Sequence, residues 1–167
     1  MPREVYSRPP RASDGCIVLA NPDLDSLRAH LQVGLTPVII ADQAEWIDAQ
    51  ALERERASLA AALEQWRADW ASRDTERYLG HYSQRFASGR QDLKSWAAHK
   101  RTVNAGKTWI QVRLANVSML RYPVERDVVV VTFQQDYRSN GLSNVIKKRQ
   151  YWMKEGSRWM IIYEGAA

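Results

Sequence analysis

The sequence predicts an α+β protein, in which helices come first along the chain and antiparallel strands follow them. Leucine and tryptophan recur at helical spacing between about residues 51 and 71. From Trp109 onward the apolar period changes to two, which is typical of strands. Asn140-Gly141, set between two alternating segments, is a strong signal for a β-hairpin turn.

These patterns predict three helices followed by a four-stranded antiparallel meander. The helices are expected at about residues 51–71, around residues 78–82, and at 91–103; the strands are expected at 109–120, 128–138, 145–154 and 158–164. The alternation slips near Asn116, so we expect a β-bulge there.

The first 41 residues differ in character from the remainder, because Pro, Gly, Ser and Asp punctuate them. Two apolar runs, at residues 17–19 and 36–40, are expected to form strands on either side of a helix that starts at Asn21-Pro22-Asp23 and ends near His30. So small a piece cannot bury its own faces, which indicates the remnant of a domain. We therefore expect a domain remnant at 1–41, a connection at 42–51 and a complete domain at 52–167.

The element order, the tryptophan-rich first helix and the closing strand at 158–164 give the second part a family likeness. Residues 52–165 resemble an NTF2-like domain, the cone fold shared with ketosteroid isomerases and SnoaL-type cyclases. The resemblance implies three helices packed on a curved antiparallel sheet around a pocket. The expected substrate-binding wall is aromatic: Tyr78, Tyr82, Trp96, Trp109, Phe133, Tyr137, Tyr151 and Trp152.

A cysteine motif lies in the first part of the chain. Ser13, Gly15 and Cys16, followed by Ile17-Val18-Leu19, resemble the nucleophile motif of YkuD-type L,D-transpeptidases, with Asp14 where that motif usually has His. A branch of that family carries C-terminal NTF2-like domains. The resemblance implies that residues 1–41 are the end of a β-rich catalytic domain, with Cys16, Gly15, Asp14 and Ser13 as catalytic positions and Arg11 as a substrate-binding residue.

The chemistry of acyl transfer explains these residue types. A thiolate attacks an acyl carbon, glycine leaves room for the substrate backbone, and nearby backbone N–H groups can hold the oxyanion. The competing interpretation of Cys16 is a buried structural cysteine. The family's catalytic His precedes its Cys, and no His precedes Cys16 here, whereas His30, His81 and His99 are expected to be surface or packed residues. We therefore expect Met1 to be internal to a longer enzyme and the chain as given to be inactive.

Composition limits the partners. The net charge is +5, but the densest basic run, Lys147-Lys148-Arg149, lies inside an expected strand and no nucleic-acid module accompanies it. The single cysteine excludes an internal disulfide, and we expect no membrane span, signal peptide, metal or cofactor. The expected partner is a peptidoglycan stem peptide or glycan in the periplasm or cell envelope, with a homodimer left open.

Two other functions remain open. A self-contained isomerase or cyclase needs an acid–base residue in a dry pocket, for which Asp74, Asp92 and Asp136 are candidates. Asp136 alternates with Phe133 and Tyr137 and is expected to point away from their face. The third function is a binding module without catalysis.

Overall fold

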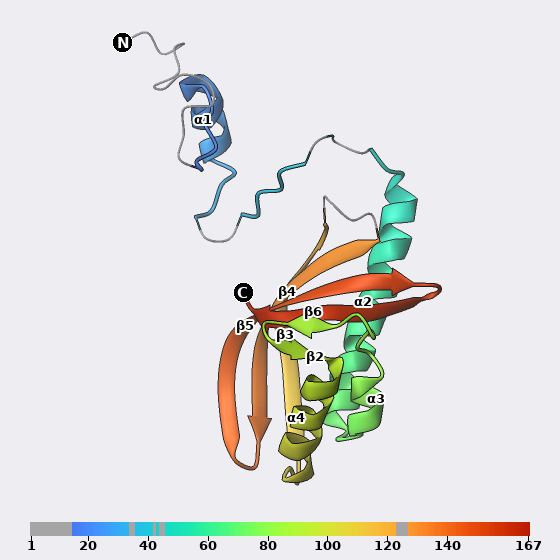
Figure 1. The fold of residues 1–167 in the computed structure, drawn as a ribbon. Coiled ribbons are helices and arrows are strands. Elements are labelled where there is room, and N and C mark those ends of the chain that lie inside the picture. Colours follow the sequence, from blue (N-terminus) through green and yellow to red (C-terminus); the bar gives the residue numbers. More distant parts are fainter. Residues whose placement is uncertain (1–14, 34–35, 42, 44–45, 123–126) are drawn as a thin grey trace. The chain divides into compact units, whose positions relative to one another are not determined.

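The computed structural model describes residues 15–33, 36–41, 43, 46–122 and 127–167 (Figure 1). The chain divides into two compact units, residues 1–40 and 41–167. The first unit contains helix α1 (Asn21–Arg28), which begins after Ala20 without a side-chain cap and has no buried residue.

The strands expected at residues 17–19 and 36–40 are wrong, since the described residues of these runs form no strand. Ile17 is 57% exposed and Val38 is 65% exposed. A strand is stable only when its N–H and C=O groups pair with a neighbouring strand. The apolar runs therefore have strand-like sequence without a strand partner among the described residues.

The second unit opens with the long helix α2 (Ala49–Ala71). The Asp48 carboxylate caps it by accepting a hydrogen bond from the Ala51 N–H at 2.8 Å. The predicted apolar stripe is confirmed, because Leu59, Leu63 and Trp66 are buried. The helix begins at Ala49, directly after this cap and two residues before the predicted start. The pattern of apolar residues does not mark the cap.

Two shorter helices follow, α3 (Thr75–Leu79) and α4 (Leu93–Ala105), each started by an aspartate. Asp74 caps α3 through the Arg77 N–H, and Asp92 forms a capping box with Ser95 in α4. Both aspartates were acid–base candidates, and both are exposed capping residues instead. Between the helices lies a small hairpin that the sequence did not predict, β1 (Ala87–Ser88) paired with β2 (Gln91–Asp92).

The main sheet is the predicted antiparallel meander. Its strands are β3 (Ile110–Arg121), β4 (Val128–Ser139), β5 (Leu142–Glu155) and β6 (Arg158–Ala166), in the order β3-β4-β5-β6. Asn140-Gly141 turns the chain between β4 and β5, as expected. The bulge near Asn116 is also confirmed, since the register shifts between Ala115 and Ser118 and Asn116 has a φ of 54°. A second shift, between Tyr151 and Trp152, was not predicted.

Helices α2, α3 and α4 gather against one side of this sheet (Figure 1). On strand β4 the buried residues recur with a period of two from Val129 onward; they are Val129, Val131, Phe133, Gln135, Tyr137 and Ser139, and Val128 before them is also buried. The apolar residues Val129, Val131, Phe133 and Tyr137 join the helices in one core that is rich in Trp and Tyr. The fold thus surrounds an aromatic interior with helices on one side and the curved sheet on the other.

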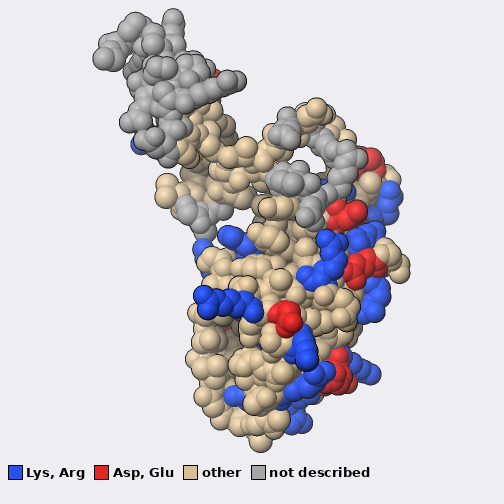
Figure 2. Space-filling view, in the orientation of Figure 1, with Lys and Arg blue, Asp and Glu red and all other residues tan. Residues whose placement is uncertain are grey.

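On the face seen in Figure 2, Lys and Arg are interspersed with Asp and Glu over the second unit, and no broad patch of one sign forms. Across the described residues, no helix is both long enough and apolar enough to cross a membrane.

Candidate functional site

A carboxylate lies in the interior of the cone. Glu164 on β6 has a side chain with 0% exposure. Its Oε2 accepts hydrogen bonds from the Tyr82 hydroxyl at 2.8 Å and from Gln150 Nε2 at 2.9 Å, and its Oε1 is bonded by the Lys148 ammonium. Trp152 Nε1 donates to Gln150 Oε1 at 2.9 Å, which turns the Gln150 amide group toward Glu164. Both carboxylate oxygens are therefore occupied by donors.

Two further aromatic residues support Tyr82. The hydroxyl oxygens of Tyr78 and Tyr82 lie 2.6 Å apart, and Trp66 Nε1 donates to the Tyr82 oxygen at 3.2 Å. Because the single hydroxyl proton of Tyr82 is directed to Glu164, Tyr78 must be the donor in the pair. Burial and the charge of Glu164 raise the pKa values of Tyr78 and Tyr82 well above 10, so both remain proton donors at neutral pH.

The charge on Glu164 is stabilised by two lysines. Burial raises the pKa of Glu164, but the charges of Lys148 and Lys100, with the hydrogen bonds from Lys148 and Gln150, outweigh it and hold the pKa below 4.5. Burial lowers the pKa of Lys100 against the attraction of Glu164. The Lys100 ammonium lies 4.3 Å from the ring centroid of Trp96, which adds a cation–π contact.

This arrangement is unsuited to proton abstraction. A carboxylate with a lowered pKa that already accepts three hydrogen bonds is a weak base, because protonating it would cost those charge-assisted bonds. Glu164 instead fixes Tyr82, Gln150 and Lys148 around it. The interior network is thus an anchor that orders one end of the cone.

The sequence pattern did not reveal the interior carboxylate. Asp136 was the one carboxylate expected on a strand with the aromatic residues, and its expected outward direction agrees with its pairing with Arg138 at 3.0 Å. Glu164 was missed because of the second bulge. Tyr151 pairs with Tyr163 but Trp152 pairs with Ile161, so Ile162 is an extra residue on β6. Simple alternation from the buried Ile161 would send Glu164 outward, and the extra residue reverses that direction.

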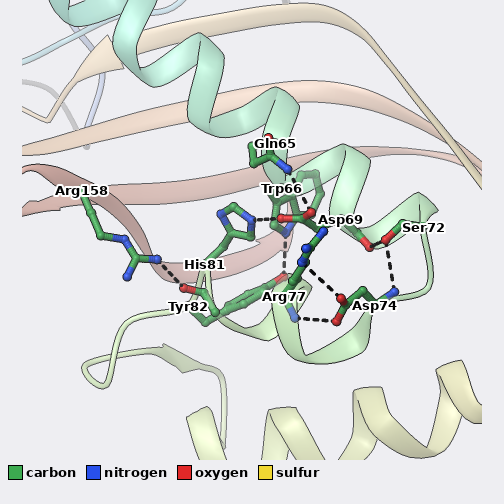
Figure 3. Close-up of polar contacts among 10 residues, drawn as sticks. Gln65, Trp66, Asp69, Ser72, Asp74, Arg77, His81, Tyr82 and Arg158 are labelled. Atoms are coloured by element: carbon green, nitrogen blue, oxygen red, sulfur yellow. Dashed lines mark hydrogen bonds and ion pairs between the residues drawn. The ribbon is translucent and has the colours of Figure 1, made fainter.

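A second group of polar residues lies nearer the surface, where α2, α3 and β6 meet (Figure 3). His81 Nε2 and Asp69 Oδ2 are 2.7 Å apart, and Gln65 Nε2 donates to Asp69 Oδ1 at 2.9 Å. The side chains of His81 and Asp69 are only 13% and 9% exposed. This pair was not predicted, because the two residues are 12 positions apart in different elements and share no sequence motif.

The pair forms the floor of an open depression with a volume of about 390 Å³. Its lining residues are Gln65, Asp69, Arg77, Gly80, His81 and Arg158. Arg158 Nη2 donates to the Gly80 carbonyl at 3.2 Å, and Arg77 Nε lies 3.3 Å from Asp74 Oδ2 (Figure 3). An imidazole held by a carboxylate and flanked by two guanidinium groups has the chemistry of an anion-binding site.

The structure places the predicted aromatic wall mostly in the core. Tyr78, Tyr82, Trp96, Phe133 and Tyr137 are buried, and so is Trp152. Tyr82 contacts both Tyr78 and Trp96, with ring centroids 5.3 and 5.9 Å apart. These rings fill the interior themselves, so a ligand could touch them only if the interior opened.

The other two aromatic candidates lie apart from that group. Trp109 is 47% exposed and precedes β3. Tyr151 is half-buried and packs between Tyr122 and Tyr163, at 5.5 and 5.1 Å.

The transpeptidase-like residues fall in the first unit. Gly15 has a φ of 92°, a left-handed conformation that favours glycine, and Cys16 is exposed rather than buried as a structural cysteine would be. Arg11, Ser13 and Asp14 lie outside the described residues. His30 and His99 are exposed.

The helices and the curved antiparallel meander define the second unit as an α+β cone of the NTF2-like class. Residues 58–165 match the model of the family described as the Cds6 C-terminal NTF2-like domain, and the chain belongs to this family. No match is found among curated proteins.

Solved structures give a wider comparison. Bd1075 of Bdellovibrio bacteriovorus is 28% identical, with a TM-score of 0.78 over 94% of this chain and 56% of that chain. The helical cell shape determining protein Pgp2 of Campylobacter jejuni is 23% identical, with a TM-score of 0.72 over 90% of this chain and 54% of that one. An NTF2-like protein of unknown function from Pseudomonas putida KT2440 is 15% identical, with a TM-score of 0.55 over 70% of this chain and 85% of that chain.

Bd1075 and Pgp2 are longer than this chain. The chain spans just over half the length of Bd1075 and Pgp2. At 23% and 15% identity, the likenesses to Pgp2 and to the Pseudomonas protein show the fold alone.

Proposed function

We propose that this chain is the cysteine-bearing end of a peptidoglycan L,D-transpeptidase or carboxypeptidase, joined to an NTF2-like domain that binds wall peptide. The supporting observation is the extent of the likeness to Bd1075. The family match covers residues 58–165, whereas the likeness to Bd1075 covers 94% of the chain and so extends into the unit that carries Gly15 and Cys16. Pgp2, named for its role in helical cell shape, is similar over 90% of the chain, and bacterial shape is maintained by the wall.

The cysteine segment suits acyl transfer. The Cys16 thiolate would attack the carbonyl of meso-diaminopimelate in a stem peptide, forming a thioester as the peptide C–N bond breaks and the leaving amine takes a proton. An amine of a second stem, or water, would then take the acyl group and regenerate the thiol. The exposure of Cys16 and the permissive backbone of Gly15 both favour contact with a substrate.

The NTF2-like domain is assigned binding and not catalysis. The role follows from Glu164, whose occupied oxygens and lowered pKa make it a weak base. The mixed surface charge in Figure 2 favours a small or locally recognised ligand over a polyanion.

The test compares the complete product of the gene with residues 1–167, each incubated with muropeptides that carry tetrapeptide stems. The complete product should form cross-links or shortened stems, and Cys16→Ala should abolish both. Residues 1–167 should do neither, because the nucleophile needs a positioned base to become a thiolate. Turnover that survives Cys16→Ala would refute the proposal.

A second candidate is a small-molecule enzyme of the isomerase or cyclase kind. The observation in its favour is the Glu164 carboxylate in an aromatic interior beside the Tyr78 and Tyr82 hydroxyls. A panel of steroid-like and polyketide-like compounds distinguishes the two. Turnover by residues 1–167 that is lost in Glu164→Gln, with the fold retained, would favour this enzyme.

A further inference from the structure

The Asp69–His81 depression lies outside the aromatic interior. His81 and Tyr82 are consecutive, yet His81 is directed to Asp69 (Figure 3), whereas Tyr82 bonds inward to Glu164. The depression therefore has its own floor and its own charged rim. Neither the Cys16 chemistry nor the Glu164 network uses it.

The floor fixes the orientation of His81. Both oxygens of Asp69 are engaged, one by Gln65 and one by His81 Nε2, so Asp69 acts as a charge partner for the imidazole. With Nε2 directed at Asp69, Nδ1 is the ring nitrogen left for another partner.

The rim supplies guanidinium donors. Arg158 is exposed and is held by the bond from its Nη2 to the Gly80 carbonyl, and Arg77, with a side chain 72% exposed, is held through Nε by Asp74. A guanidinium carries about five N–H donors, so one such contact leaves most of them for a ligand. Both arginines are thus held in place while most of their N–H donors remain available to a ligand.

We propose that this depression binds the terminal carboxylate of a peptide, with Arg77 and Arg158 as donors beside the His81 imidazole. The charged groups around the depression are Asp69 from α2, Asp74 and Arg77 around α3, and Arg158 from β6. Each aspartate already has a partner, since Asp69 is bonded to His81 and Gln65, and Asp74 is bonded to Arg77. The unused guanidinium N–H groups of the two arginines are therefore the donors that a carboxylate would meet.

The size of the depression agrees with such a ligand. A volume of about 390 Å³ is near the lower end of ligand sites, enough for a peptide terminus and not for a folded partner. Asp69 and Asp74 repel a phosphate dianion more strongly than a singly charged carboxylate. That the peptide is a wall stem rests on the proposed function; that a carboxylate binds here does not.

The experiment titrates residues 1–167 with N-acetyl-dialanine, with its C-terminal amide, with inorganic phosphate and with a wall tetrapeptide, followed by calorimetry and NMR. We expect the acid to bind at least ~10-fold more tightly than the amide and more tightly than phosphate. Arg158→Gln and Arg77→Gln should each weaken binding by about 10-fold. Arg138→Gln, an exposed arginine paired on the outer face of the sheet, is the control and should change nothing.

The NMR signals give an independent readout. The side-chain signals of Arg77, Arg158 and His81 should shift when the acid binds, and those of Arg138 should not. Equal binding of acid and amide would overturn the proposal, and so would an unchanged affinity in both Arg77→Gln and Arg158→Gln. If the wall tetrapeptide binds and these variants have no effect, the site is wrong while the proposed function stands. If N-acetyl-dialanine binds through the arginines and the tetrapeptide does not bind, the site stands while the wall-peptide function fails.

Discussion

Glu164→Gln is the sharpest test of the interior network, because it removes one charge and keeps the volume of the side chain. Glu164 is completely buried and is bonded by Tyr82, Gln150 and Lys148. In the variant, the Lys148 ammonium loses its counterion. The new amide N–H₂ group replaces one acceptor oxygen and faces side chains that are themselves hydrogen-bond donors. The network is thereby broken without creating a cavity.

The magnitude follows from the burial of the two partners. Removing one partner of a buried ion pair costs about 3–5 kcal/mol, because the other charge is left uncompensated. Two features reduce the loss here: the amide keeps one acceptor oxygen, and Lys148, with a side chain 13% exposed, can turn its ammonium toward water. We therefore expect the free energy of unfolding to fall by about 2–4 kcal/mol.

Urea unfolding of residues 1–167, followed by tryptophan fluorescence, measures this change. The midpoint should fall while the slope of the transition stays constant, since the same surface is exposed on unfolding. Asp136→Asn is the matched control, because Asp136 is also paired with a cation on a strand but lies on the outer face. It should scarcely shift the midpoint. Equal effects of the two substitutions would refute the assignment of Glu164 as a buried anchor.

The pH dependence of stability tests the same role of Glu164. The pKa of Glu164 is lowered from 4.5 in the folded protein, so the stability it contributes is present above about pH 4.5 and is lost as the pH falls through the folded-state value. The difference between the wild type and Glu164→Gln should shrink accordingly below pH 4.5.

Lys148→Met should reverse the direction of this pH dependence, because burial then dominates and raises the pKa of Glu164. That variant should become more stable, relative to the wild type, between pH 7 and pH 5. A constant difference over this range would contradict the role of Lys148.

Other predictions concern the backbone and the two units. Asn116, at a φ of 54°, should tolerate Gly, whereas Val should cost about 1–2 kcal/mol in urea unfolding because a β-branched side chain is strained there; equal stability of the two variants would contradict the bulge. Asp48→Ala removes the cap of α2 and should cost about 1 kcal/mol by the same assay. Hydrogen exchange should be slow in residues 128–137, which pair on both sides, and fast in residues 17–19; strong protection of the latter would mean that they have found a strand partner.

Much of the fold follows from local pattern. The buried stripe of α2, the alternation along β4 and the turn at Asn140-Gly141 were all predicted, because each depends on residues close together in sequence. Alternation along the expected strand at residues 145–154 likewise accounts for the partly buried Lys148 between the exposed Lys147 and Arg149. The strands expected in the first unit failed, because apolar runs specify a strand only where a partner strand is present.

The sequence by itself therefore determined the order of the three helices and the four meander strands of the second unit, the NTF2-like fold and the cysteine motif on which the transpeptidase proposal rests. Only the tertiary structure decided which polar groups meet. Glu164 and Tyr82 are 82 positions apart, and Glu164 faces inward only because the extra residue in β6 reverses the alternation. The Asp69–His81 pair likewise forms only when the end of α2 packs beside the turn after α3. A local period is set by neighbours along the chain, whereas a bulge and a contact between distant side chains are set by the packing of the whole domain.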